Sequence, residues 1–144
     1  YTLSFLITHA NQEIRKFNSR YELQQVKHSL GIRVIDHDRA DDIRDTTSLS
    51  GGETFIVSLG LALGLSALSS RNISFENLFI DEGFGTLDPD TLATVIDSLA
   101  MLQSSQGKKV GVISHTDTMS ERITTQIRII KNGNSGSSHI EIYP

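Results

Sequence analysis

The hydrophobic residues at the start of the chain follow a helical spacing. Five of them recur at alternating intervals of four and three residues: Leu3, Ile7, Ala10, Ile14 and Phe17. This alternation is that of a coiled-coil seam, although two repeats fit an amphipathic helix packed on its own domain just as well. Because the chain begins at Tyr1 rather than at Met, we expect a fragment in which residues 1–18 end a longer coiled coil.

Short alternating runs follow this helix and predict strands. Residues 21–26 and 32–36 are two such runs, with Gly31 as the break between them. Residues 37–42 are polar and predict a turn before a return strand that begins at Ile43.

The polar turn is acidic, and its carboxylates resemble those of a calcium loop that begins at Asp36. Asp41 stands where such a loop requires glycine, and Thr47 stands where it requires a bidentate glutamate. An acidic hairpin turn is therefore the better interpretation.

The longest apolar stretch covers 14 residues, 55–68, and contains serines and glycines. It is too short for a membrane span and predicts a buried helix over residues 53–68, opened by Gly51 and Gly52. Ser50 is a natural N-cap for this helix. Gly60 and Gly64 lie on one face and predict close approach to a neighbouring element.

The second half of the chain alternates between strand and helix patterns. Buried strands are predicted at residues 77–81 and 109–114, with a helix between them that starts at Asp88-Pro89 and ends at Gly107. A short helix over residues 117–122 and a hairpin of residues 126–130 and 139–143 complete the pattern. We expect an α/β domain with a mostly parallel sheet, flanked by helices and hairpins.

The composition limits the classes of protein to which the chain can belong. The 144 residues suit a single domain, and the net charge of −4 provides no general footprint for nucleic acid. The absence of cysteine agrees with a reducing cytosol, and no signal peptide is visible. We expect a cytoplasmic protein without membrane partners.

Three groups of residues suit phosphate chemistry. Asp81 and Glu82 end an apolar strand, where one carboxylate suits Mg²⁺ and the other suits a base or a water-positioning group. Ser50, Gly51 and Gly52 offer backbone N–H groups at a helix start. His115 follows a strand and suits a γ-phosphate contact. Each group alone also has an ordinary structural explanation.

The order of these groups resembles the C-terminal half of an ABC-type ATPase. Residues 48–53 match the signature motif, residues 78–82 the Walker B strand, and residues 85–88 the D-loop; His115 matches the switch histidine. The resemblance implies that Glu82 and His115 are catalytic and that Asp81 binds Mg²⁺. It also implies that a set of residues contacts ATP: Ser48, Ser50, Gly51, Gly52, Glu53 and Asp88.

Two positions indicate the branch of this superfamily. Transport ATPases usually have glutamine and proline where this chain has Glu53 and Gly83. Residues 81–88 resemble the SbcC-type exonuclease subunits of DNA double-strand-break repair. A chromosome-organising ATPase of the SMC type is the nearest alternative, a transport ATPase is a weaker one, and a plain α/β binding module is the weakest.

The SbcC resemblance implies a split ATPase head whose P-loop lies in an absent N-terminal half. No P-loop motif occurs in this chain; Gly107-Lys108-Lys109 lacks the earlier glycine and the hydroxyl residue. The expected partners are that N-terminal half, a second copy of the head, an SbcD-like metallo-nuclease and, through the complex, double-stranded DNA. ATP-driven head dimerisation would control the nuclease in repair and recombination, and the isolated chain would be an inactive ATPase fragment.

Overall fold

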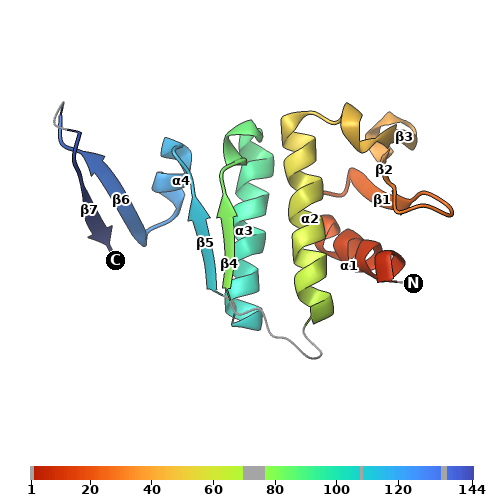
Figure 1. The fold of residues 1–144 in the computed structure, drawn as a ribbon, viewed down its shortest axis with the longest axis horizontal. Helices are drawn as coiled ribbons and strands as arrows, with labels where there is room; N and C mark the ends of the chain where they lie inside the picture. Colours follow the sequence, from red (N-terminus) through yellow and green to blue (C-terminus); the bar gives the residue numbers. More distant parts are fainter. Residues whose placement is uncertain (1, 70–76, 108, 134–135) are drawn as a thin grey trace. The chain divides into compact units, whose positions relative to one another are not determined.

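The computed structural model describes residues 2–69, 77–107, 109–133 and 136–144. The chain divides into two compact units, Tyr1–Ile113 and Ser114–Pro144. The first unit contains two helices packed closely together, a three-stranded sheet, and a parallel strand pair with its connecting helix (Figure 1).

Helix α1 (Thr2–Phe17) crosses helix α2 (Gly51–Ser69). Gly60 and Gly64 of α2 lie at this crossing, as predicted. A Cβ atom at Gly64 would lie 2.6 Å from the backbone nitrogen of Ala10, and one at Gly60 would overlap Cγ1 of Ile14. Ala10 and Ile14 are fully buried there, so the predicted amphipathic face of α1 is the face that packs on α2.

The three-stranded sheet is antiparallel, in the order β1 (Tyr21–Gln25), β2 (Ile32–Asp36) and β3 (Asp42–Asp45). A one-turn helix, η1 (His37–Arg39), joins β2 to β3, and a second, η2 (Thr46–Ser48), leads toward α2. Asn11 of α1 fixes this sheet, because its Nδ2 donates to the carbonyl of Leu23 at 2.9 Å and its Oδ1 accepts from the Leu23 nitrogen at 2.7 Å. The predicted strands are confirmed to within two residues.

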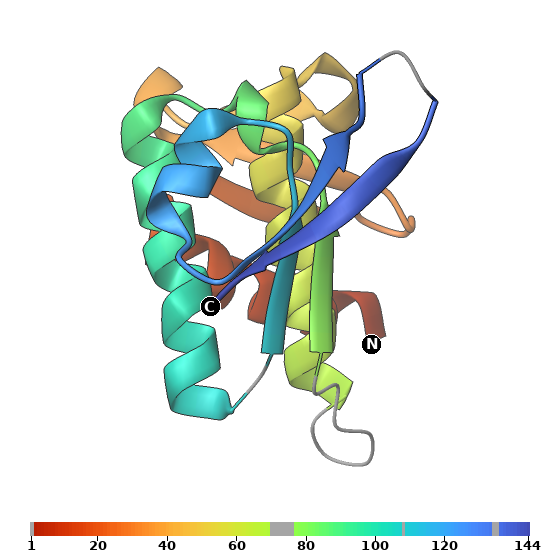
Figure 2. The same cartoon turned by 90° about the vertical axis from the view of Figure 1, so that its left-hand side faces the viewer.

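The remaining part of the first unit is a β–α–β segment. Strands β4 (Asn77–Asp81) and β5 (Lys109–Ile113) pair in parallel, and the one-turn helix η3 (Phe84–Thr86) and helix α3 (Pro89–Gln106) connect them (Figure 2). Asp88 caps α3 by accepting a hydrogen bond from the Thr91 nitrogen at 2.9 Å. Gly107 ends the helix in the left-handed conformation.

Two expectations about the sheet need correction. Strands β4 and β5 were expected to be buried, yet the side chain of Phe79 is 75% exposed and that of Ile113 is 54% exposed. Within the described part of the first unit, that face of the strand pair is left largely uncovered. The sheet was also expected to be mostly parallel, but β4–β5 is the only parallel pair in the described part of the chain. The strands before and after it form antiparallel hairpins because short turns join them.

The second unit consists of helix α4 (Asp117–Arg122) and an antiparallel hairpin of β6 (Gln126–Lys131) and β7 (Ser138–Tyr143). Both elements were predicted within one or two residues. Ile127 pairs with Ile142 and Ile129 pairs with Ile140, and all four side chains are exposed.

Helix α2 is longer than predicted, and by length and composition alone its residues Gly51–Leu68 could cross a membrane. Its contacts are those of a core helix, because Ile56, Val57, Leu59 and Leu63 are buried within the unit. The same helix packs closely on α1 through glycines. We therefore retain the interpretation of a buried helix.

Candidate functional site

The signature motif starts helix α2 through a reciprocal pair of hydrogen bonds. The Ser50 nitrogen donates to Oε2 of Glu53 at 2.7 Å, and the Glu53 nitrogen donates to Oγ of Ser50 at 3.4 Å. This is a capping box, and it confirms Ser50 as the N-cap. The helix begins at Gly51 rather than after the two glycines. Gly51 and Gly52 therefore place their N–H groups in the first turn, where no intrahelical acceptor exists.

Glu53 is held from several sides. Arg44 of β3 donates from Nη1 to Oε1 at 2.9 Å and from Nη2 to Oε2 at 3.2 Å, and the hydroxyl of Tyr21 donates to Oε1 at 3.0 Å. The hydrogen bonds from Arg44, followed by those from Ser50 and Tyr21, lower the pKa of Glu53 to about 2. The carboxylate is therefore ionised at neutral pH, and both of its oxygens accept hydrogen bonds from within the chain.

Ser48 lies at the end of η2 and is fixed by backbone contacts. Its hydroxyl donates to the carbonyl of Asp45 at 2.8 Å, and its own carbonyl accepts from Nη2 of Arg44 at 2.7 Å. Ser48 and Ser50 are both exposed, so the loop lies at the surface while its backbone is held from behind.

The D-loop packs directly against the signature loop. A Cβ atom at Gly52 would lie 2.7 Å from the carbonyl oxygen of Thr86, so only glycine permits this approach. Phe84 is almost fully buried, and its ring packs edge to face on that of Phe55, with 4.8 Å between the ring centroids. Two motifs that are more than thirty positions apart in the sequence thus form one surface.

A polar cleft of 610 Å³ lies where the two loops meet. Ser50, Gly52, Glu53 and Thr86–Asp88 line it from the loops, and residues 17–21 line it from the end of α1. Asp88 is exposed at its edge, and hydrogen bonds from Thr91 hold the pKa of Asp88 below its usual value. Its observed contact is the cap of α3; contact with ATP stays a prediction.

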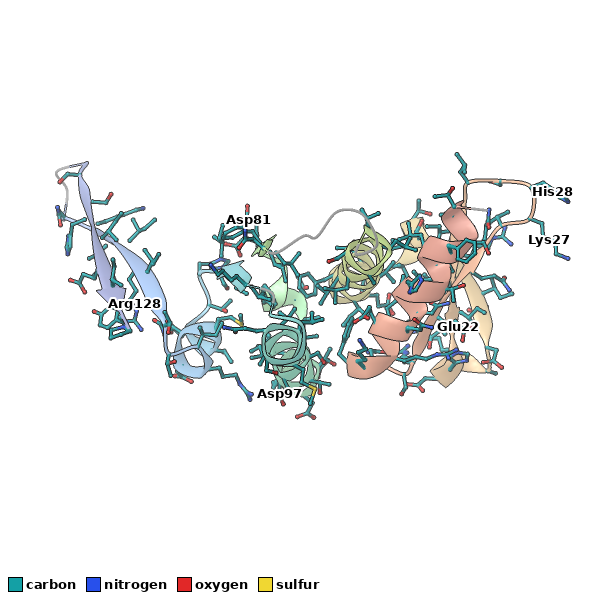
Figure 3. The ribbon with its side chains drawn as sticks, turned by 90° about the horizontal axis from the view of Figure 1, so that it is seen from below. Glu22, Lys27, His28, Asp81, Asp97 and Arg128 are labelled. Carbon is teal, nitrogen blue, oxygen red and sulfur yellow. The ribbon has the colours of Figure 1, made fainter. Side chains whose placement is uncertain are left out.

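Asp81 and Glu82 lie at the carboxyl end of β4, as predicted. Figure 3 shows Asp81 on the side of the strand pair away from α3, on whose outer side Asp97 lies. Glu82 has the positive φ of 60° that is unusual for a residue other than glycine, and its nitrogen donates to the carbonyl of Ile113 at 2.9 Å. Conformations of this kind are concentrated at functional sites.

Gly83 continues this turn with φ of 94°, and a Cβ atom there would overlap the ring of Phe55. The turn after Glu82 therefore rests on the first helical residues after the signature. The first unit brings together the signature loop, the D-loop and the Asp81–Glu82 turn.

Asp81 suits a magnesium ion that is bound by few protein side chains. Among the described residues there is no group of three or more histidine or carboxylate side chains that could form a complete protein site. An exposed carboxylate at a strand end suits Mg²⁺ that takes its other ligands from phosphate and water.

His115 belongs to the second unit, residues 114–144, and lies exposed between β5 and α4. The site in the first unit is thus built without it, and its role as the switch histidine stays a prediction.

Sequence reasoning missed two residues of this site: Tyr21 and Arg44. In the sequence, Arg44 has the pattern of an ordinary charged residue of a hairpin strand. Its contact with Glu53 depends on how the hairpin folds back toward α2, and no local pattern indicates that approach.

Comparison with known proteins agrees with these motifs. Residues 22–101 match the model of the family described as SbcC/RAD50-like, Walker B motif. The chain is 49% identical over 138 residues to the SbcC subunit of the nuclease SbcCD from Pseudomonas aeruginosa, covering 96% of this chain and 11% of that protein. It is 48% identical over 137 residues to the corresponding subunit from Rhodobacter capsulatus, covering 95% of this chain and 11% of that protein.

A solved structure shares the fold. It comes from work on ATP-driven dimerisation and DNA-stimulated activation of SMC ATPases, and it superposes with a TM-score of 0.73 at 16% identity. The match covers 99% of this chain and 86% of that chain. The expectation of an ATPase-head fold is confirmed.

The chain spans 11% of the length of these curated relatives. The extent of the family match and the identity to the relatives are nevertheless decisive for classification. The chain belongs to the SbcC/RAD50-like family.

Proposed function

We propose that this chain is the C-terminal half of a split ATPase head in an ATP-dependent DNA nuclease complex of repair and recombination. The observation that carries the proposal is the packing of three motifs in one unit: Gly52 lies against Thr86, and Gly83 lies against Phe55. A family whose relatives are named as subunits of a nuclease supports the same conclusion.

The residues of the site divide between two nucleotides. Ser50 and Gly52 would contact the γ-phosphate of ATP held by a second head, because they are presented at a helix start that favours anions. Asp81 and Glu82 would act on ATP held by the P-loop of their own head, together with His115.

Glu82 carries the hydrolytic step in this proposal. Its carboxylate orients a water molecule toward the γ-phosphate and accepts its proton. The strained turn fixes the carboxylate at the end of β4. A magnesium ion bound at Asp81 would neutralise charge on the phosphate oxygens.

The partners follow from the same assignment. The N-terminal half supplies the P-loop and covers the exposed face of Phe79. A second copy completes the nucleotide site, and an SbcD-like metallo-nuclease cuts double-stranded DNA under control of the head. We place the complex in the cytoplasm.

The test compares the isolated chain with the full-length protein. We expect the isolated chain to show no ATP turnover, since it lacks a P-loop. In the full-length protein, Glu82→Gln should leave ATP binding intact and lower kcat by at least about a hundredfold. Asp97→Asn, which changes a carboxylate on the outer side of α3, is the matched control and should hydrolyse ATP normally. Glu82-dependent turnover by the isolated chain, or normal turnover by Glu82→Gln, would overturn the proposal.

A further inference from the structure

A network of five polar side chains lies behind the signature loop, and we call it the signature clamp: Arg20, Tyr21, Asp36, Arg44 and Glu53. The residues come from the three-stranded sheet, from α2 and from the loop before β1. Figure 1 shows the three-stranded sheet beside the first turn of α2, which is where these side chains meet.

The base of the clamp is a buried charge. The side chain of Asp36 is 0% exposed, and it accepts two parallel hydrogen bonds from Arg20, from Nε and from Nη2, each at 2.7 Å. This bidentate contact with Arg20 holds the pKa of Asp36 below its usual value. A buried carboxylate paired in this way is a fixed negative charge.

Arg44 lies between this charge and the signature loop. Its Nη1 is 3.5 Å from Oδ2 of Asp36 and 2.9 Å from Oε1 of Glu53, and its Nη2 donates to the carbonyl of Ser48 at 2.7 Å. The side chain is 13% exposed. One planar guanidinium thus contacts acceptors from β2, from the loop and from the helix, a geometry that lysine does not reproduce.

The contacts of Arg44 reach both ends of the loop. Ser48 is held directly, and Ser50 is held through Glu53, whose carboxylate accepts from the Ser50 nitrogen. Ser48, Ser50 and Gly51 are nevertheless exposed on the opposite side of the loop. The clamp therefore fixes the backbone from behind and leaves the outer side open.

We propose that Arg44, supported by Asp36, is a positioning residue that sets the signature loop for the nucleotide of the opposing head, and that Glu53 transmits this positioning to Ser50. The inference rests on the proposed function, because it assumes that the signature acts on ATP bound elsewhere. It gives Glu53 an indirect role: its oxygens are occupied by Arg44, Tyr21 and the Ser50 nitrogen.

The charge of Glu53 matters in this proposal. A glutamine at position 53 could still accept the hydrogen bond from the Ser50 nitrogen and complete the capping box. It could not form the ion pair with Arg44. Loss of the charge should therefore leave the helix intact and loosen the loop.

The experiment uses the full-length protein and separates ATP binding from head engagement. We measure the Kd for ATP, the ATP-induced association of heads by sedimentation, and kcat. Arg44→Gln and Glu53→Gln should each leave the Kd for ATP within about twofold and weaken association. Each should lower kcat roughly ten- to a hundredfold, because misplacing a reacting group by about 1 Å can cost about a hundredfold. Arg44→Lys should recover part of the loss.

Two further variants make the result specific. The double variant Arg44→Gln/Glu53→Gln should lose no more association and kcat than the more strongly affected single variant. The reason is that both substitutions break the same ion pair, between Arg44 and Glu53. Arg33→Gln, which changes an exposed arginine on β2, is the matched control and should behave as the unmodified protein.

The outcomes separate this inference from the proposed function. Normal association and kcat in Glu53→Gln would overturn the inference but not the proposed function. Losses of equal size in ATP binding and in kcat would do the same. If Arg44→Gln does not fold, Glu53→Gln decides, because its side chain keeps the same shape. Absence of ATP-induced association in the unmodified protein would overturn the proposed function and the inference with it.

Discussion

At the scale of single residues, the turn after β4 combines two adjacent positive φ angles, at Glu82 and Gly83. The backbone of Glu82 adopts this conformation at a cost on the order of 1 kcal/mol, because Glu82 has a Cβ atom. At Gly83 the cost would be larger, since the ring of Phe55 occupies the position of a Cβ atom. The glycine that distinguishes this chain from transport ATPases thus has a steric explanation.

Substitution of this glycine should be costly. We expect Gly83→Ala to lower the free energy of unfolding by about 3 kcal/mol, from the left-handed backbone together with the clash against Phe55. Urea denaturation of the chain measures the change. Gly107→Ala is the matched control, because its φ is 65° and nothing lies within 4 Å of its Cβ position; it should cost about 1 kcal/mol. Equal losses in both variants would contradict the steric explanation.

At the scale of elements, the sequence predicted most helices and strands because their patterns are local. The spacing of apolar residues in α1 and the pair Asp88-Pro89 at α3 are examples. The burial of β4 was predicted wrongly for a physical reason. An apolar strand pattern predicts burial on both faces but does not say what packs there. Within the first unit the side chains of β4 alternate between exposed and half-buried, because only one face is packed.

The crossing of α1 and α2 provides a test at this scale. Gly64→Ala should lower the free energy of unfolding by roughly 1–2 kcal/mol, since the clash with the backbone of Ala10 outweighs the gain in helix propensity. Gly60→Ala should cost at least as much, because a Cβ atom there would overlap Cγ1 of Ile14, a β-branched and fully buried side chain. Ser58→Ala, at an exposed position of the same helix, should change stability by less than about 0.5 kcal/mol. Thermal unfolding of the chain ranks the three, and a cost at Gly60 or Gly64 no larger than that at Ser58 would show that the crossing is not rigid.

The candidate site could be predicted in part. Ser50, Asp81 and Glu82 were found because their motifs lie within a few residues of sequence. Arg44 and Tyr21 could not be found in this way. Each contacts Glu53 only after the sheet has folded against α2, and their sequence neighbours carry no sign of that contact.

At the scale of the whole molecule, each unit carries apolar surface that water disfavours. In the first unit Phe79 is 75% exposed; in the second, Ile129 and Ile142 are each 73% exposed. Two-stranded hairpins are marginally stable alone, and apolar patches of this kind mark interaction sites. Apolar surface of this kind agrees with the proposal that the chain packs against an N-terminal half.

The isolated chain should consequently self-associate. We expect Phe79→Ser to shift it toward the monomer, and co-production with the N-terminal half to abolish the association by covering the same surface. Sedimentation equilibrium measures both effects. Met101→Ser changes an exposed apolar residue on α3 and should leave association unchanged. A monomeric isolated chain would contradict the expectation.

The close packing of α2 on α1 has a mechanical consequence. Gly64 lies 14 residues after Ser50, about 20 Å along a helix. If α2 pivots as a rigid rod about Gly64, a tilt of about 5° displaces Ser50 by nearly 2 Å (from a rise of about 1.5 Å per residue). Displacements of about 1 Å already alter catalytic rates strongly. If the proposed function holds, α2 would act as a lever arm, and a motion of α1 too small to disturb the core would be amplified at the nucleotide.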